Sequence, residues 1–433
     1  MEKTTWSGDR GFILAAAGAA VGFGNLWSFP RRAAESGGAV FIGIYLLLAA
    51  LLGLPLLLAE LALGRETASS PRDAFRALGG SALGGVLGEL ASLFMLGFYS
   101  VLGGCCLRYA LTNLTGALRG GGEILFLRYI SNVPLSAGCT VLFLGLTCAV
   151  SMAGLRQGVE RLARLAVPIL LLMLPPLALC ALSLPGAADR FWTALTPPTG
   201  LTVRDIGAIA AAAGVQMFFS LSLGQGVMLT FGAYLPGAAR LPLCAAAVAA
   251  VDSLAALLAL CAVLPAAAGG GPAASALFAA MQTVFEGSGA WGCMFGFLFY
   301  LLVLLAALTS AVAMLEVVAC LAGPGASRRS AAAFAAALSA IPAVAIARDG
   351  MGFGALPEIF GMDWLTAAET LSEGVLMPLA TLALSLALRG ERGQRLLVRQ
   401  LGLRAGTWVH AVVRWCVPPL SALVMAARLL AAP

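Results

Sequence analysis

The sequence predicts an all-α integral membrane protein of about eleven transmembrane helices. Of its 433 residues, 61% are hydrophobic and only 11% are charged, which is typical of a chain solvated by lipid rather than water. The apolar residues gather into segments of roughly 20 residues, the length at which a helix crosses a bilayer. We expect spans near residues 11–36, 39–64, 86–118, 133–153, 159–184, 206–237, 241–265, 291–322, 330–347, 365–388 and 408–430.

The residues around these spans exclude several other classes of protein. The N-terminal MEKTTWSGDRG carries acids beside its bases and no small-residue cleavage site, so we expect the first span to be retained. The ten cysteines lie in or beside apolar segments, with no CxxC pattern and His410 as the single histidine. They are therefore predicted to be small buried hydrophobic residues rather than metal ligands or disulfides. The +6 net charge is dispersed over short loops, so no nucleic-acid partner is expected.

Basic residues are unevenly shared between the two alternating sets of loops. By the positive-inside rule, the richer set lies in the cytoplasm. We therefore expect a multi-pass protein of the inner (plasma) membrane with a cytoplasmic N-terminus and, because the number of spans is odd, an outside C-terminus. The richer set holds Lys3, Arg10, Arg65, Arg72, Arg76, Arg156, Arg161, Arg164, Arg240, Arg328, Arg329, Arg389, Arg392, Arg395, Arg399 and Arg404, and the poorer set holds Arg119, Arg128, Arg190, Arg204 and Arg348.

Two of the predicted spans, the first and the sixth, are interrupted near their middle by their own residues. Matching broken spans of this kind are typical of inverted-repeat transporters, so we expect a five-plus-five inverted repeat. A single transporter domain over residues 1–433 would hold repeats at about 11–184 and 206–388, with an extra helix at about 408–430. The interrupting residues are Gly18, Gly22, Gly24 and Asn25 in AAAGAAVGFGNLWSFP, and Ser220, Ser222, Gly224 and Gly226 in VQMFFSLSLGQGVMLTFGAYL.

A broken helix in a membrane needs a physical reason. Unpaired backbone groups cost several kcal/mol in hydrocarbon, so a break persists only where other groups satisfy the freed amides and carbonyls. Carbonyls freed at a break can coordinate a cation, and amides at the start of a half-helix can bind a carboxylate. The alternative is close helix packing through small residues, which is our interpretation for Gly37, Gly38, Gly103 and Gly104 but not for the two breaks.

Several longer motifs resemble those of the neurotransmitter:sodium symporters, particularly the bacterial eleven-span amino-acid transporters with a leucine-transporter-like fold. The similarity runs in order from about residue 6 to about residue 425. It is highly specific for the family and weakly specific for the substrate. The motifs are GFILAAAGAAVGFGNLWSFP, ESGG, GLPLLLAELALGR, GVERLARLAVP, FFSLSLGQG and LTSAVAMLEVV.

The resemblance implies two sodium sites and an amino-acid site between the two breaks. Sodium prefers hard oxygen ligands, as other hard cations do. The first sodium site would use the Ala20 carbonyl, Asn25, Ser220, Asp252 and the substrate carboxylate, and the second would use Gly18, Val21, Ala306, Thr309 and Ser310. The substrate carboxylate would meet the amides of Phe23 and Gly24 and the Tyr99 hydroxyl; its amino group would meet Ala20, Phe219, Ser220 and Ser222; its side chain would meet Met95, Phe219, Ser222, Gln225, Ser310, Ala313 and Met314.

The gates implied by the resemblance are altered in this sequence. Ser28 stands where the family usually has an arginine that pairs with an acid of the tenth span, here Glu369, with Asp363 as a second candidate. Arg31 or Arg32 could substitute, but we expect them to face elsewhere on the helix. At the cytoplasmic side Lys3, Trp6 and Tyr234 match the family, whereas Pro324 stands where the acidic partner of the N-terminal segment is expected.

Asp252 is the departure with the largest functional consequence. Many relatives carry asparagine at this position and hold an acid, or bind chloride, one helical turn later, where this chain has Ala256. A carboxylate inside a span is a functional hypothesis by default, and Asp252 could supply the charge that chloride supplies elsewhere. We therefore expect no chloride requirement. Glu35, Glu60 and Glu316 are expected to be hydrogen-bonding groups that hold helices or gates, with a direct transport role as the alternative.

These observations together predict a secondary symporter, not an enzyme. It would import a neutral, hydrophobic or aromatic amino acid with sodium by alternating access, independently of chloride. The alternatives are an amino-acid sensor that has lost transport, or a symporter for another small amine or zwitterion. A membrane enzyme is disfavoured because no nucleophile has a usable histidine, and a channel is disfavoured because no filter sequence appears. Sequence leaves the oligomeric state and the identity of the amino acid open.

Overall fold

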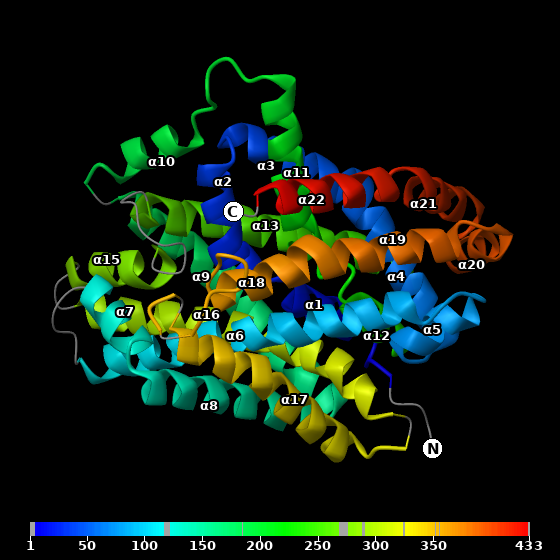
Figure 1. Cartoon of the computed structure of the whole chain (residues 1–433), viewed down its shortest axis with the longest axis horizontal. Helices are drawn as coiled ribbons and strands as arrows, with labels where there is room; N and C mark the ends of the chain where they lie inside the picture. Colours follow the sequence, from blue (N-terminus) through cyan, green and yellow to red (C-terminus); the bar gives the residue numbers. More distant parts are fainter. Residues whose placement is uncertain are drawn as a thin grey trace.

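The computed structural model describes residues 5–116, 122–183, 185–267, 276–287, 291–323, 325–350, 352–354 and 356–431, which fold almost wholly into helices (Figure 1). Within these ranges, nine helical segments are long and apolar enough to cross a membrane, and one bent pair of helices makes a tenth. They coincide with ten of the predicted spans. The remaining predicted span, 206–237, is the broken sixth, which the structure divides into two helices and which is not among these segments.

The spans of the first half follow the predicted order. The first comprises α1 (Asp9–Ala20), η1 (Gly24–Ser28) and α2 (Phe29–Glu35), and the second comprises α3 (Ala39–Leu48), η2 (Ala49–Gly53) and α4 (Leu54–Thr67). The third is α6 (Leu83–Thr115), the fourth is α8 (Val133–Met152), and the fifth is η3 (Leu155–Glu160) with α9 (Arg161–Leu182). Short helices α5 (Pro71–Ala77), α7 (Gly122–Ile130) and α10 (Ala187–Leu195) lie in the connections.

The spans of the second half also follow the predicted order, and an additional span comes after them. The sixth span comprises α11 (Val203–Ser220) and α12 (Val227–Ala233), and the seventh is α13 (Leu241–Ala267). The eighth is α16 (Gly292–Ala319), the ninth is α17 (Arg328–Asp349), and the tenth comprises α18 (Trp364–Glu369), η7 (Thr370–Leu376) and α19 (Met377–Leu388). Helices α21 (Leu403–Trp415) and α22 (Val417–Ala431) form the last span; η4 (Ala276–Ala280), α15 (Met281–Gly287), η6 (Cys320–Ala322) and α20 (Glu391–Leu401) lie between spans.

Both predicted breaks are confirmed. In the first span, α1 ends at Ala20 and the chain bends by 45° before the next helical segment begins. That segment starts as a π turn, η1, and continues directly into α2, with Pro30 in the first turn of α2. In the sixth span, the non-helical residues 221–226 separate α11 from α12. Sequence did not predict the π turns, which are frequent at functional sites.

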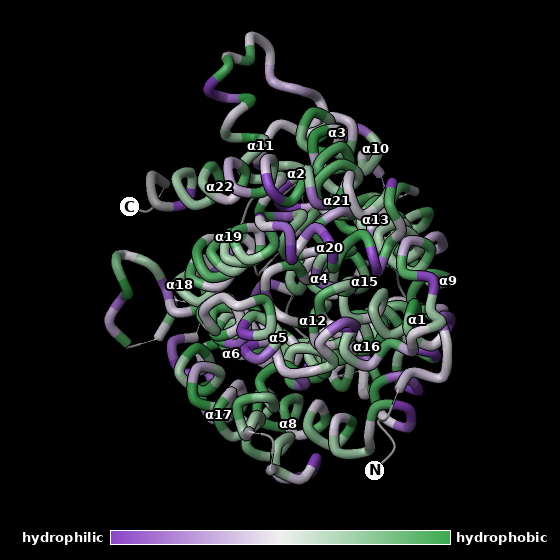
Figure 2. Tube along the Cα trace, turned by 90° about the vertical axis from the view of Figure 1, so that its right-hand side faces the viewer, coloured by the Kyte–Doolittle hydropathy of each residue, from purple (hydrophilic) through white to green (hydrophobic). Residues whose placement is uncertain are grey.

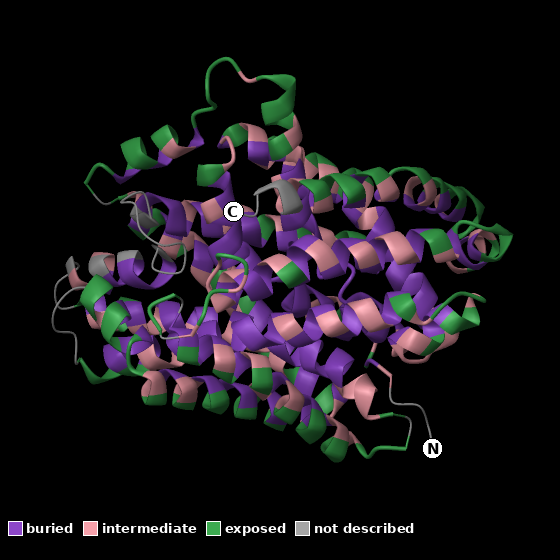
Figure 3. Ribbon diagram, viewed as in Figure 1, coloured by how far each residue is buried: buried purple, intermediate pink, exposed green. Residues whose placement is uncertain are grey.

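Burial separates central from peripheral helices (Figure 3). In α6 and α16, 78% and 72% of the most apolar stretch is buried, against 33% in α8 and α17. The two central helices pack against each other, and α1 packs against α13, α9 and α16. The broken first span therefore runs through the middle of the bundle.

Large hydrophobic side chains also cover the outside of the peripheral helices, and hydrophobic residues follow most of the helical trace in Figure 2. Leu142 on α8, Leu172 on α9 and Ile341 on α17 are 53%, 76% and 68% exposed. Exposed apolar surface of this extent is what lipid tails, rather than water, would cover.

Candidate functional site

At the break in the first span, neutral side chains accept hydrogen bonds from the freed backbone amides. The amide of Gly22 donates to Asn25 Oδ1 at 3.2 Å, and the amide of Phe23 donates to the Tyr99 hydroxyl at 3.1 Å. A Cβ atom at Gly22 would come within 2.5 Å of the Ser310 hydroxyl and 2.9 Å of the Tyr99 hydroxyl. Glycine is therefore required there for α1, α6 and α16 to meet at the break.

The break in the sixth span has a different construction. Ser222, Gly224 and Gly226 all adopt positive φ angles, at 54°, 76° and 76°. The amide of Gly224 donates to a carboxylate oxygen of Glu60 at 2.7 Å, and the carbonyl of Gln225 accepts from the Ser92 hydroxyl at 2.7 Å. These braces come from α4 and α6, so the break is fixed by its neighbours.

A fully buried polar cluster joins the two breaks. Asn25 Nδ2 donates to Asp252 Oδ1 at 2.8 Å and to its carbonyl at 3.0 Å, and the Ser220 hydroxyl donates to the same carboxylate at 2.8 and 2.9 Å. The Tyr45 hydroxyl donates to Asp252 Oδ2 at 3.0 Å. All four residues are 0% exposed. The cluster combines α3, η1, α11 and α13, and it contains three of the residues predicted for the first sodium site.

Asp252 has no basic partner among the residues that the structure describes, since none of their ion pairs involves it. A buried carboxylate without a counter-charge is costly, and a cation is the most direct remedy. Hard oxygens of a carboxylate, an amide and a hydroxyl suit sodium. The residues present therefore fit a sodium ion.

A second group of oxygens lies where α1 meets α16. The Ser310 hydroxyl lies 3.2 Å from the Gly18 carbonyl and 3.4 Å from the Ala306 carbonyl, and the Thr309 hydroxyl lies 2.8 Å from the Ala306 carbonyl. A Cβ atom at Gly18 would lie 3.2 Å from Thr309 Cβ. Four residues predicted for the second sodium site are thus brought together, and the fifth, Val21, directly follows α1.

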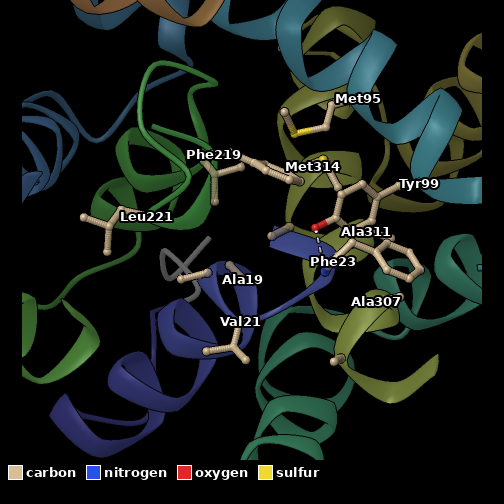
Figure 4. Packing of buried hydrophobic residues seen from close by; sticks show 14 of the residues in the cluster. Ala19, Val21, Phe23, Met95, Tyr99, Phe219, Leu221, Ala307, Ala311 and Met314 are labelled. Atoms are coloured by element: carbon tan, nitrogen blue, oxygen red, sulfur yellow. Dashed lines mark hydrogen bonds between the residues drawn. The ribbon is translucent and has the colours of Figure 1, made fainter. Parts of the chain in front are cut away.

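Apolar side chains gather beside the first break (Figure 4). The Tyr99 ring lies edge-on to Phe23 and Phe219, with ring centroids 4.9 and 6.1 Å apart. Figure 4 places Met95 and Met314 next to these rings. Ala313 and Gln225 are also buried, and Gln225 Oε1 has no hydrogen-bond partner among the described residues.

Three further predicted substrate contacts, Ser222, Ala20 and Gly24, lie at or beside the two breaks. The Ser222 hydroxyl, expected near the substrate, donates to the Ala19 carbonyl at 3.2 Å and so links the two broken spans directly. Ala20, expected to offer its carbonyl, is the last residue of α1 and is buried. A Cβ atom added at Gly24 would lie 3.6 Å from the Phe219 ring.

At the Glu369 end of the site, the structure contradicts one prediction from the sequence. Arg31 and Arg32 both reach Glu369, at 2.8 and 3.3 Å, so the prediction that they face elsewhere is wrong. The reason is helical periodicity, because Arg32 follows Ser28 by four residues and therefore shares its face one turn farther along. Ser28 itself donates to Gln216 at 3.1 Å. Asp363, the second candidate acid, instead caps the N-terminus of α18.

The opposite end of the site is closed by aromatic residues. Trp6 Nε1 donates to the Phe231 carbonyl at 3.0 Å, and the Trp6 amide donates to the Tyr234 carbonyl at 3.2 Å. The Trp6 ring packs edge-on against Phe12, Phe231 and Tyr234. Lys3 and Pro324, which also entered the expectation for this gate, lie outside the described residues.

Glu60 and Glu316 hold helices together, as predicted, whereas Glu35, for which the same role was predicted, is exposed at the end of α2. Glu60 braces the sixth break, and Glu316 accepts from the Ser151 hydroxyl at 2.5 Å and from Arg328 at 2.6 Å. Sequence reasoning did not identify Tyr45, Gln216 or Glu373 as site residues. Glu373 could have been found, because it follows Glu369 by one helical turn.

Comparison with known proteins identifies the family. The profile described as the Sodium:neurotransmitter symporter family matches residues 3–120. The chain is 32% identical, over 95% of its own length and of the relative's, to an uncharacterized sodium-dependent transporter, YhdH, of Bacillus subtilis. It is 30% identical to the uncharacterized sodium-dependent transporter MJ1319 of Methanocaldococcus jannaschii, over 58% of this chain and 53% of the relative.

A solved structure agrees over nearly the whole length. The crystal structure of MhsT in complex with L-phenylalanine superposes with a TM-score of 0.89 at 28% sequence identity, covering 98% of this chain and 99% of that one. The broken helices, the oxygen-lined cluster between them and these similarities lead to one conclusion: the chain is a multi-pass membrane transporter that belongs to the sodium:neurotransmitter symporter family, whose members are sodium-dependent.

Proposed function

We propose that this protein imports a neutral, hydrophobic or aromatic amino acid together with sodium. The observation that carries the proposal is Asp252, a carboxylate that is 0% exposed, lacks a basic partner among the described residues, and binds Asn25 and Ser220 at the two breaks. A sodium ion would neutralise it there, and the substrate carboxylate would complete the coordination. Binding of ion and substrate would thus be linked, because each reduces the electrostatic cost of the other.

The two predicted sodium sites remain our assignment. The first would use Ala20, Asn25, Ser220 and Asp252, and its support is the hydrogen-bonded cluster between the first span, α11 and α13. The second would use Gly18, Val21, Ala306, Thr309 and Ser310, supported by the convergence of their oxygens at the α1–α16 contact. Both are oxygen-only sites, as sodium prefers.

The substrate would lie against the first break. Its carboxylate would take over the amides of Phe23 and Gly24 and the Tyr99 hydroxyl, and carbonyls of the two breaks would accept from its amino group. Its side chain would lie among Met95, Phe219, Ala313 and Met314, an adaptable apolar surface. The relative MhsT was crystallised with L-phenylalanine, which supports a substrate of this class. The remaining proposed contacts are Ala20, Ser220, Ser222, Gln225 and Ser310.

Transport should not require chloride. Asp252 already places a fixed negative charge beside the first sodium site, and Ala256, one turn later on α13, offers no group that could bind an anion. A second anion beside Asp252 would be repelled in this low-dielectric environment. Chloride independence therefore follows from the position of one carboxylate.

The proposed transporter is a single domain of two inverted repeats in the inner (plasma) membrane, with its N-terminus in the cytoplasm and its C-terminus outside. The support for this orientation is the arginine-rich loop set that includes Arg65, Arg328 and Arg392. It makes the Trp6 and Tyr234 end cytoplasmic and the Glu369 end external.

Uptake of labelled amino acids into vesicles containing the purified protein tests the proposal. We expect accumulation of leucine, methionine or an aromatic amino acid only with an inward sodium gradient, unchanged when gluconate replaces chloride. Binding without uptake would identify a sensor, and uptake of a different amine or zwitterion would identify a different substrate class. More efficient uptake of glutamate or lysine would contradict the proposed class, because the apolar pocket offers no counter-charge.

A further inference from the structure

A cleft rich in arginine lies between α20, α5 and the end of α4, and neither the ion sites nor the substrate site explains it. We call it the α20 cleft. It has a volume of about 550 Å³, and Arg392, Arg395, Arg399 and Glu66 supply its charged side chains. Figure 1 shows α20 and α5 at the same end of the helix bundle.

The three arginines project from one face of α20. Leu396 and Leu397 of this helix are buried, whereas Arg392, Arg395 and Arg399 are exposed. Residues three, four and seven positions apart share a helix face, so the guanidinium groups point to the same side. The helix packs against α21 and α4. It therefore presents its basic face to the cleft while its apolar face is buried.

The wall of the cleft is fixed by hydrogen bonds from α4. Arg65 Nε donates to Gln400 Oε1 at 2.6 Å, and Arg65 Nη1 donates to the Ala239 carbonyl at 2.7 Å. Glu66, the next residue, accepts from Gln400 Nε2 at 2.5 Å and forms an ion pair with Arg399. The cleft is thus held in place without a ligand.

Two of the arginines lack a strong acidic partner. Arg395 lies 3.6 Å from Glu391, and both side chains are mostly exposed, so this pair contributes little. No ion pair within the described part of the chain includes Arg392. A Cβ atom at Gly79 would lie 2.9 Å from Arg392 Nη1, which places this guanidinium group against the turn that follows α5. The cleft therefore has an excess of positive charge.

An exposed tryptophan beside α20 indicates where the lipid headgroups lie. Arg389, which directly follows α19, has its guanidinium carbon 5.7 Å from the centroid of the Trp415 ring, and that of Arg414 lies 4.8 Å from it. Trp415 is 61% exposed. Exposed tryptophan next to arginine is typical of the membrane–water interface. Since α20 begins two residues after Arg389, the cleft lies beside the headgroup layer.

Phosphate is the anion that best suits this site. A guanidinium group offers paired donors that match phosphate oxygens, and it keeps its charge at any physiological pH. Basic pockets at the cytoplasmic ends of spans are suited to anionic lipid headgroups, because they add local hydrogen bonds to the attraction of the charged leaflet. A lipid also brings acyl chains, which the neighbouring apolar spans can accommodate, whereas a soluble phosphate does not.

We propose that the α20 cleft binds the phosphate-bearing headgroup of an anionic phospholipid. Arg392 and Arg395 bind the phosphate oxygens directly, and Arg399, held by Glu66, adds positive charge at the end of the cleft. The bound headgroup joins α20 to α5 and so stabilises this end of the bundle. The proposal rests on the proposed function only for the orientation, which determines the leaflet that supplies the lipid.

Lipid selectivity provides the first test. The purified full-length protein in detergent is titrated with phosphatidylglycerol, and bound lipids are counted by native mass spectrometry. We expect it to bind about tenfold more tightly than phosphatidylcholine with the same acyl chains, and equal binding of the two would overturn the proposal. Glycerol phosphate tests the soluble alternative. If it displaces phosphatidylglycerol at a similar concentration, the ligand is a soluble phosphate and the lipid assignment is wrong.

A pair of double variants separates the cleft from general surface charge. Arg392→Gln with Arg395→Gln should weaken phosphatidylglycerol binding about tenfold. Arg161→Gln with Arg329→Gln is the matched control, because it removes two exposed arginines of the same predicted set of loops that lie outside the cleft. The control should change the affinity less than about twofold. Equal losses in the two double variants would show that only net charge attracts the lipid and would overturn the site.

Lysine substitutions show whether any loss reflects charge or damage to the fold. Arg392→Lys with Arg395→Lys keeps both charges and loses only the paired geometry, so it should bind phosphatidylglycerol within about threefold of the unchanged protein. If it binds as weakly as the glutamine variant, the arginine charges do not hold the lipid and the proposal fails. These measurements need neither sodium nor an amino acid. Absence of sodium-driven uptake would therefore refute the proposed function alone, and absence of lipid selectivity would overturn the lipid site alone.

Discussion

The two breaks differ in what satisfies their freed backbone groups. At the first, the amides of Gly22 and Phe23 meet a side-chain amide and a hydroxyl, from Asn25 and Tyr99. At the sixth, the amide of Gly224 meets the carboxylate of Glu60 from a neighbouring helix. The Asn25 and Tyr99 groups lie beside the proposed substrate site and can give way to a ligand carboxylate, whereas Glu60 holds the Gly224 amide from α4, within the helix bundle. We infer that the first break responds to ligands and that the sixth is a fixed support.

Loss of the Asp252 carboxylate, which connects the two breaks, should have the largest effect on transport. Asp252→Asn removes the negative charge that joins Asn25 to Ser220, and sodium-driven uptake should fall on the order of 100-fold, as for truncation of a buried charge pair. The measurement is initial uptake with gluconate in place of chloride. Adding Ala256→Ser to the variant should restore some activity, and only with chloride present. A variant as active and chloride-independent as the parent would show that this charge lies elsewhere.

The fixed nature of the sixth break can be tested at Glu60. Glu60→Ala removes the brace on the Gly224 amide and should lower the free energy of unfolding by about 2 kcal/mol, the cost of an unsatisfied buried donor. Glu60→Gln keeps an acceptor and should lose much less. Thermal unfolding without substrate gives both values. Equal losses in the two variants would mean that the hydrogen bond does not support the break.

At the first break, by contrast, we expect a substitution of Tyr99 to reduce substrate affinity more than it reduces stability. Tyr99→Phe retains the ring against Phe23 and Phe219 but removes the hydroxyl that meets the Phe23 amide. Substrate affinity should fall about tenfold, equivalent to about 1.4 kcal/mol. The unliganded protein should lose less stability than Glu60→Ala does. Isothermal titration and thermal unfolding of the same samples would separate the two quantities, and a change in stability alone would contradict the assignment.

The smallest effect is expected at the aromatic end. Trp6→Phe preserves an aromatic ring near Phe231 and Tyr234 but loses the hydrogen bond from Nε1 to the Phe231 carbonyl on α12. Stability should fall by about 1 kcal/mol, the net value of one hydrogen bond, with little change in equilibrium substrate affinity. A loss of affinity as large as that of Tyr99→Phe would extend the responsive region to α12.

Both breaks could be predicted from the sequence, because clustered glycine and polar residues at mid-span disfavour a continuous helix in lipid. Asp252 could be recognised because an isolated acid in an apolar span is costly without a function. Tyr45 could not, since a tyrosine in a hydrophobic helix usually packs like any other aromatic residue until its hydroxyl partner is known. The contacts of Arg32 with Glu373 and Gln216 could not be predicted, because they depend on how α2, α11 and η7 meet in space, and no local pattern reports that meeting.

The sodium dependence of amino-acid binding to the purified protein tests the shared site most directly. If sodium and the substrate carboxylate share the cluster of Asn25, Ser220 and Asp252, the affinity for the best substrate should rise steeply with sodium concentration. Binding of the substrate should be undetectable when a large organic cation such as N-methyl-D-glucamine replaces sodium at equal ionic strength. Equal affinity in sodium and in the organic cation would contradict the shared site.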